Sequence, residues 1–145
     1  MHYRKGIGAV VFKKNPTRFL IFHRTKNWSG WELLKGGLKP DENELKALRR
    51  ETKEETGLKT FKIIGKIGYK VKYKWPKNFV KDHHKFIGAE NNYYLIEVFS
   101  EKIKIDKREH NKYRWVTKTQ ALKLLTYEDN KRALRKAVMK YGEIL

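Results

Sequence analysis

Residues 36–58 constrain the fold of this chain more than any other segment. They begin with two glycines and continue into a stretch, 42–56, in which apolar residues recur with the spacing of an α-helix. Asp41 follows a proline and precedes Glu44 by three residues, a pattern that predicts an N-cap with a capping box. Gly57 is typical of a helix end, because glycine adopts the left-handed conformation without strain. We therefore expect a helix over 42–56.

The segments on either side of this helix have the alternation of β-strands. Two β-rich runs separated by Asn15-Pro16 predict a hairpin, and three later runs predict further strands, of which 61–75 is either one long strand or a hairpin. The five runs are 5–13, 18–24, 61–75, 92–99 and 112–117. A loop is expected over 79–90, and helical stretches over 119–125 and 128–141. Strands flanking a central helix, with helices closing the chain, predict an α/β sandwich with a mixed sheet.

Length and composition limit the remaining possibilities. The 145 residues contain no linker-like stretch, so we expect a single domain over 1–145. The absence of cysteine, of a secretory signal and of a long apolar run favours a cytoplasmic protein without a membrane partner. No obligate protein partner is evident. The net charge of +19 is suited to polyanions such as nucleotides, RNA or DNA, although a lysine-rich proteome would produce the same excess.

Three acidic residues cluster on the predicted helix. Glu51, Glu54 and Glu55 fall within an arc of about 100° on the helical wheel. The neighbouring stripe, which we expect to be buried, consists of Leu45, Leu48 and Thr52. Crowded carboxylates repel one another, and a hard cation such as Mg²⁺ relieves that repulsion. The alternative is a solvated acidic face paired with nearby lysines.

The spacing around these glutamates resembles the box of the Nudix family, G-x5-E-x7-R-E-U-x-E-E-x-G-U, in which U is apolar. Residues 36–42 and 50–58 fill every Gly, Glu and Arg position in register, and only Thr52 departs from an apolar position. The resemblance implies an α/β/α sandwich and hydrolysis of nucleoside diphosphates linked to another group. It also implies a role for each box residue: Glu51, Glu54, Glu55 and the Gly36 carbonyl bind the metal, Arg50 orients a glutamate, and Glu42 anchors the loop to the helix.

The resemblance continues beyond the box. Residues 73–80 are similar to a Y-K-x-P-K-x-x-V stretch of the RNA pyrophosphohydrolases. Those relatives and the dinucleoside polyphosphate hydrolases continue with G-Q-x-Q, whereas residues 88–91 read Gly-Ala-Glu-Asn. Glu109, seven residues before Val116, matches a distal glutamate that completes the metal site as ligand or general base. Glu97 and Glu101 are the alternative candidates for this distal glutamate.

Several cations and one aromatic residue are candidates for substrate binding. By resemblance, Tyr127 matches an aromatic that stacks on a base, and the alternative is a core aromatic. The cations that could meet a phosphate are Arg24, Lys35, Lys74, Lys77 and Lys81, for which ordinary surface positions are the alternative. The adjacent His83 and His84 lack the further ligands of a zinc site.

The sequence therefore predicts an Mg²⁺-dependent nucleotide pyrophosphohydrolase, with Mn²⁺ able to replace Mg²⁺. Its substrate is expected to be a dinucleoside polyphosphate, such as diadenosine tetraphosphate, or the 5′-triphosphate end of RNA. Two alternatives are a pyrophosphatase of oxidised nucleoside triphosphates and a non-catalytic nucleotide- or RNA-binding module. The second alternative is disfavoured because no box glutamate is missing.

Overall fold

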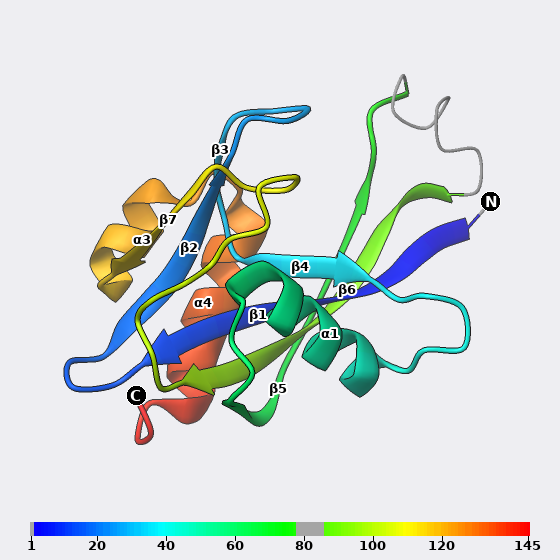
Figure 1. Cartoon of the computed structure of the whole chain (residues 1–145). Helices are drawn as coiled ribbons and strands as arrows, with labels where there is room; N and C mark the ends of the chain where they lie inside the picture. Colours follow the sequence, from blue (N-terminus) through cyan, green and yellow to red (C-terminus); the bar gives the residue numbers. More distant parts are fainter. Residues whose placement is uncertain (1, 78–85) are drawn as a thin grey trace.

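The computed structural model describes residues 2–77 and 86–145, which build an α/β/α sandwich around a mixed sheet (Figure 1). The strands are β1 (His2–Lys13), β2 (Arg18–Arg24), β3 (Gly30–Glu32), β4 (Leu34–Gly37), β5 (Phe61–Lys74), β6 (Phe86–Val98) and β7 (Lys112–Val116). The described helices are α1 (Glu44–Thr56), α3 (Lys118–Leu124) and α4 (Glu128–Tyr141). The fold class expected from the sequence is confirmed.

Strand β1 lies at the centre of the sheet. Along the main path the strands follow the order β3-β2-β1-β6-β5, while β4 pairs with β1 and β7 pairs with β2. The β1–β6 ladder is parallel and the other ladders are antiparallel, which makes the sheet mixed. The hairpin predicted around Asn15-Pro16 is present as β1 and β2.

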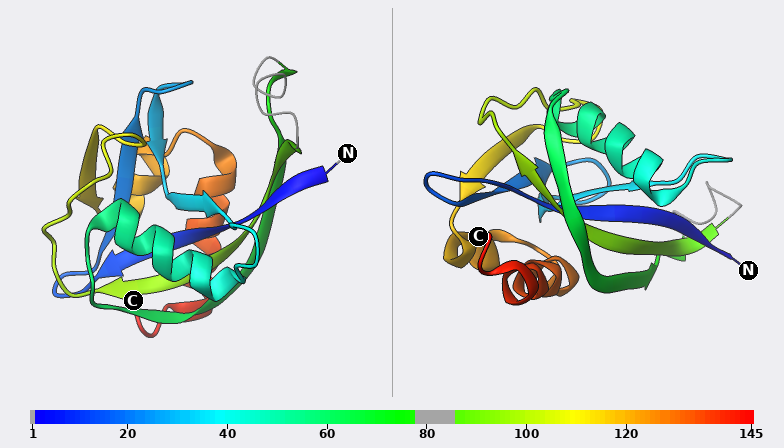
Figure 2. Two further views of the ribbon diagram at one scale, coloured as in Figure 1. Left: turned by 45° about the vertical axis from the view of Figure 1, so that its right-hand side comes forward. Right: turned by 90° about the horizontal axis from the view of Figure 1, so that it is seen from below.

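Helices cover both faces of the sheet. Figure 2 shows α1 on one face and α4 on the other. Side chains of β1 alternate between two cores: Ile7 and Val11 pack on the α1 side, whereas Val10 and Phe12 pack on the α4 side. Because both of its faces are buried, this part of β1 is almost uniformly apolar.

The start of α1 differs from the sequence prediction. The helix begins at Glu44, and Asn43 is its N-cap, with Oδ1 accepting a hydrogen bond of 2.8 Å from the Lys46 amide. Asp41 has a φ of 63° and lies in the preceding loop. Glu44 turns away from the helix start, because its carboxylate accepts hydrogen bonds from the Tyr94 hydroxyl and a neighbouring asparagine. The end of α1 at Gly57 is confirmed, with a φ of 70°.

The buried stripe of α1 also differs from the prediction at one position. Leu45 is 49% exposed, because the buried stripe runs through Ala47, Leu48 and Thr52. The burial expected for Leu48 and Thr52 is confirmed. The Thr52 hydroxyl donates to the Leu48 carbonyl at 2.7 Å, so this polar residue is satisfied inside the helix.

The loop prediction over 79–90 is wrong for 86–90, which belong to β6. Strand β6 already begins at Phe86, and 78–85 lie outside the described residues, as do Lys81, His83 and His84. The short strands β3 and β4 were not predicted, because each is too brief to show a period of two. No described helix has the length and apolar character needed to cross a membrane.

Candidate active site

The loop before α1 is tied to the helix by a two-pronged ion pair. Arg50 Nε and Nη2 donate to the two carboxylate oxygens of Glu42, each at 2.8 Å. Arg50 Nη2 also donates to the Gly37 carbonyl at 2.9 Å, and Glu42 accepts from the Lys39 amide at 2.9 Å. The hydrogen bonds from Arg50 lower the pKa of Glu42 to about 2. This planar, bidentate pair fixes the glycine-rich loop over the middle of α1.

The same guanidinium reaches two glutamates of α1. Arg50 Nη1 donates to Glu51 at 2.7 Å and to Glu54 at 3.3 Å. The orienting role that the resemblance implied for Arg50 thus has a geometric basis, although its shortest contacts are with Glu42 and Glu51. The Glu54 side chain is 42% exposed, and the longer contact with Arg50 is its only hydrogen bond to the described residues.

Glu51 lies in an unfavourable electrostatic environment below β4. Burial raises the pKa of its carboxyl to about 7, the Arg50 guanidinium opposes the rise, and the charges of Glu55 and Glu54 add to it. A side chain at Gly36 would collide with the Glu51 carboxyl, so only glycine allows the β4 backbone to approach this carboxylate.

A chain of buried polar groups begins at Glu55. His110 Nδ1 contacts Glu55 Oε2 at 2.8 Å, and His110 Nε2 contacts Glu32 Oε2 at 2.7 Å. The three side chains are only 3–4% exposed. Burial opposes the charge of His110, but the hydrogen bonds with Glu32 and Glu55 raise its pKa to about 9. A protonated imidazole has two N–H donors, which satisfy one buried carboxylate on each side.

Glu32 connects these buried polar groups to two cations. Its Oε2 lies 3.2 Å from Arg24 Nη1, and its Oε1 lies 3.3 Å from Lys35 Nζ. Burial opposes ionisation of Glu32, yet the hydrogen bond from His110 and these positive charges lower the pKa of its carboxyl. Glu32 therefore holds two of the cations that the sequence assigned to the substrate.

Glu109 lies on the rim of this cluster. Its carboxylate is 3.9 Å from Arg24 Nη2, and its negative charge contributes to the raised pKa of Glu55, which burial dominates. Its rivals lie elsewhere: Glu97 sits on β6 with Lys14 as its ion-pair partner, and Glu101 is paired with Lys13. The structure thus brings Glu109, and neither rival, to the cluster.

The other predicted substrate residues are spread over the surface. Tyr127 is 50% exposed, immediately before α4, and meets the Trp28 ring edge-on at 4.8 Å between centroids. The Arg24 guanidinium lies 5.4 Å from the centroid of the same Trp28 ring. Lys74 and Lys77 are exposed at and beyond the end of β5, and no described contact joins them to the glutamates.

The donor chemistry of the cluster fits a hard divalent cation. Glu51, Glu54 and Glu55 supply only oxygen atoms, and the first and last have raised pKa values that a cation would lower. Among the described residues, no three acidic or histidine side chains surround a common point as they stand. Arg50 holds two of these carboxylates and His110 holds the third, so ion binding requires the carboxylates to reorient.

Sequence reasoning missed Glu32 and His110. Glu32 occupies an unpredicted strand of three residues, and His110 was not among the candidate site residues. No local pattern marks either one, because their roles come from contacts across 55 and 78 positions of the sequence. The adjacency of His110 to Glu109 is the only signal that could have drawn attention to it.

Comparisons with known proteins identify the family. The model of the NUDIX domain matches residues 2–137. This chain is a Nudix hydrolase. An RNA pyrophosphohydrolase of a Nitratiruptor species is 30% identical, over 96% of this chain and 92% of that protein. The RNA pyrophosphohydrolase of Hahella chejuensis is 27% identical, over 79% of this chain and 76% of its own length.

Solved structures share the fold. A C. elegans Ap4A hydrolase in a binary complex superposes with a TM-score of 0.80 at 22% identity, covering 97% of this chain and 98% of that one. The dihydroneopterin triphosphate pyrophosphohydrolase of E. coli gives a TM-score of 0.78 at 18% identity, with 97% and 99% covered. Nudix hydrolases generally use a divalent metal such as Mg²⁺ and act on nucleotide polyphosphates.

Proposed function

We propose that this Nudix hydrolase cleaves a phosphoanhydride bond of a nucleoside 5′-polyphosphate with the help of Mg²⁺, which Mn²⁺ can replace. The observation that carries the proposal is the placement of three glutamates on α1 beneath a loop that Arg50 and Glu42 lock in place. Burial and neighbouring negative charges leave Glu51 and Glu55 with raised pKa values, as expected of ligands that lack their cation.

The residues divide into metal-binding and substrate-binding groups. The metal would be held by Glu51, Glu54, Glu55, Glu109 and the Gly36 carbonyl. When bound, it neutralises phosphate charge and lowers the pKa of a bound water. Arg24 and Lys35, both paired with Glu32, would bind phosphate oxygens; their ion pairs beside the glutamate cluster support this role. Glu109 would take a proton from the attacking water; its half-exposed position at the rim supports this role.

The substrate we favour is the 5′-triphosphate end of RNA. The curated relatives described above act on RNA, and the net charge of +19 attracts a long polyanion more strongly than a free nucleotide. Dinucleoside polyphosphates are the second candidate. The aromatic pair of Trp28 and Tyr127, with Arg24 over Trp28, offers a place for a base.

A Mg²⁺-dependent assay separates these substrates. Purified protein is given 5′-triphosphorylated RNA, diadenosine tetraphosphate or free nucleoside triphosphates, and released phosphate, pyrophosphate or nucleotide is measured. We expect the highest kcat/KM with RNA. Preferential turnover of the dinucleotide would reverse the order of the two candidates, and turnover of none of the three would refute the proposal.

Glu54→Gln tests the site itself. Because Glu54 is partly exposed and has one long contact, the variant should fold normally and lose several orders of magnitude in kcat. Glu101→Gln is a matched control, since Glu101 is an exposed glutamate whose ion-pair partner, Lys13, does not belong to the cluster. A near-normal rate in Glu54→Gln would show that the metal lies elsewhere.

A further inference from the structure

Aromatic and cationic side chains form a patch at the end of strand β2. Trp31 on β3, His23 on β2 and Lys112 on β7 stand opposite one another, so they share one face of the sheet. Arg114 lies two residues along β7 and points to the same face. We call these four residues the Trp31 patch.

Three side chains of the patch converge on the indole of Trp31. Lys112 Nζ lies 5.6 Å from the ring centroid, and Arg114 Cζ lies 6.0 Å away. The His23 ring meets the indole edge-on at 4.9 Å. Trp31 is partly buried against the α4-side core, whereas Lys112 and Arg114 are exposed. The patch therefore presents a partly exposed aromatic ring beside two exposed positive charges.

The two cations have no acidic partner among the described residues. In the described part of the chain, neither the Lys112 nor the Arg114 side chain forms an ion pair or a hydrogen bond. By contrast, Lys5 and Lys70 on the other side of the sheet are both paired with Glu90. Cations beside a partly exposed aromatic ring suit a single-stranded nucleic acid, whose phosphates bind the charges while its bases stack on the ring.

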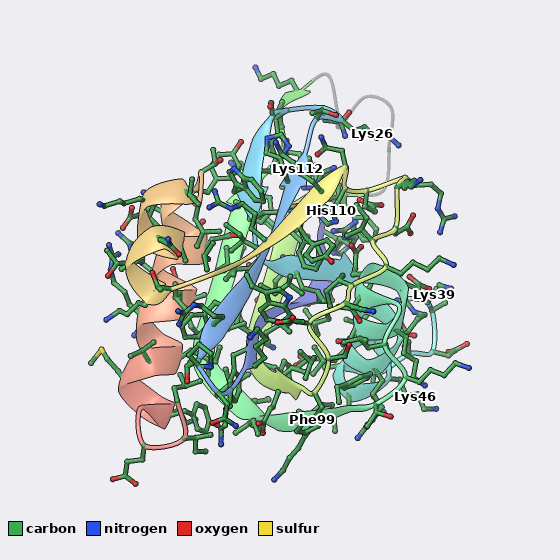
Figure 3. All side chains as sticks on the ribbon, turned by 60° about the vertical axis from the view of Figure 1, so that its left-hand side comes forward. Lys26, Lys39, Lys46, Phe99, His110 and Lys112 are labelled. Atoms are coloured by element: carbon green, nitrogen blue, oxygen red, sulfur yellow. The ribbon has the colours of Figure 1, made fainter. Side chains whose placement is uncertain are left out.

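The patch is continuous with the proposed substrate site. The Trp31 amide donates to Thr126 Oγ1 at 3.0 Å, and the next residue, Tyr127, meets Trp28. The Arg24 guanidinium lies over the Trp28 ring and is paired with Glu32. Figure 3 shows Lys112 at the same end of the molecule as Lys26, with His110 near them and with Lys39 and Lys46 on the α1 side.

We infer that the Trp31 patch binds the nucleotides of single-stranded RNA that follow the 5′ end. Lys112 and Arg114 contact backbone phosphates, and Trp31 lies beneath the bases. The inference rests on the proposed function and extends it from the 5′ phosphates to the body of the RNA. A free nucleoside triphosphate has no nucleotide to place there, so the patch selects substrate by length.

The test compares long and short substrates of the double variant Lys112→Ala/Arg114→Ala. The substrates are a 5′-triphosphorylated RNA of about 15 nucleotides and a 5′-triphosphorylated dinucleotide. We expect KM for the long RNA to rise roughly tenfold, because two phosphate contacts are lost, while kcat and the dinucleotide kinetics stay unchanged. Each phosphate contact contributes about 0.7 to the slope of log affinity against log salt concentration. The slope of the double variant should therefore be less steep than that of the wild type by about 1.4.

The matched control is Lys59→Ala/Lys62→Ala. It removes the same charge from two exposed lysines at and just before the start of β5, the strand at the opposite end of the sheet order. We expect this control to keep the wild-type KM for the long RNA. An equal loss in the control would overturn the inference, because net charge alone would then explain the effect.

Two further outcomes would also overturn the inference: an unchanged KM for the long RNA, and an equal loss on both substrates. Fluorescence anisotropy with a 5′-hydroxyl RNA of about 15 nucleotides measures binding without turnover. If the wild type cleaves no RNA but binds this probe through Lys112 and Arg114, the proposed substrate fails and the patch stands. A wild type that does not bind the probe would refute the patch.

Discussion

Replacing Glu51 with glutamine should stabilise the metal-free protein while removing its response to Mg²⁺. The Glu51 side chain is 12% exposed, and burial together with the charges of Glu55 and Glu54 raises its pKa to about 7. Glutamine has nearly the same shape, and its oxygen can still accept the 2.7 Å hydrogen bond from Arg50. The substitution therefore removes an unfavourable charge and keeps the packing.

The magnitude follows from the difference in pKa between the folded and unfolded states. The carboxyl of Glu51 has an ordinary pKa of 4.5 and a folded value of about 7. At about 1.4 kcal/mol per pKa unit, this difference corresponds to at most about 3 kcal/mol. As pH rises from 4.5, the unfolded chain loses its proton first, so the folded wild type loses stability until pH 7. The gain from Glu51→Gln is thus near zero at about pH 4 and greatest at about pH 8.

The assay is urea unfolding of both proteins at about pH 4 and about pH 8, in EDTA and with Mg²⁺. Without metal, the variant should unfold at a higher urea concentration than the wild type only at the higher pH. At a Mg²⁺ concentration of about 100 times Kd, the wild type should gain about 2.7 kcal/mol, and the variant should gain little. An equal effect of the substitution at both pH values, or an unchanged response to Mg²⁺, would refute the reasoning.

The remaining predictions concern the buried polar chain and the start of α1. His110→Phe leaves Glu32 and Glu55 without their shared donor and should lower the free energy of unfolding by about 3 kcal/mol or more at about pH 6. The folded pKa of His110, about 9, exceeds the ordinary 6.5. Its contribution to the free energy of unfolding is therefore complete below pH 6.5 and is lost as pH rises through 9. The urea midpoints of the wild type and His110→Phe should converge between about pH 6 and about pH 9.5. A gap that does not change with pH would contradict this. Asn43→Ala should destabilise by about 1 kcal/mol in thermal unfolding, and Asp41→Gly, at a position with positive φ, by less than about 0.5 kcal/mol. A larger loss of stability in Asp41→Gly than in Asn43→Ala would show that Asp41 is the N-cap.

Secondary structure was predictable wherever a segment was long enough to show its period. The alternation over 61–75 predicted one long strand or a hairpin, and the structure has the single strand β5 with its end within one residue. Gly57 correctly predicted the end of α1. The helix start was misplaced by two residues, because Asp41 and Asn43 are both good caps by residue type. Only the turn geometry, with its positive φ at Asp41, decides between them.

The sequence by itself determined which glutamates share a face of α1, since residues 51, 54 and 55 lie close together on any helix. It also determined the family, through the register of Gly36, Glu42, Arg50 and Gly57 with those glutamates. These features depend on spacing along one segment, and spacing is what a sequence records directly.

Only the tertiary structure decided which groups hold the glutamates in place. His110 contacts Glu55, and Glu32 contacts the substrate cations, because the segment before β7 lies between β3 and α1. Likewise, the cations on β7 face Trp31 only because both strands flank β2. Contacts between distant segments arise from strand pairing and packing, and no local pattern of residues encodes them.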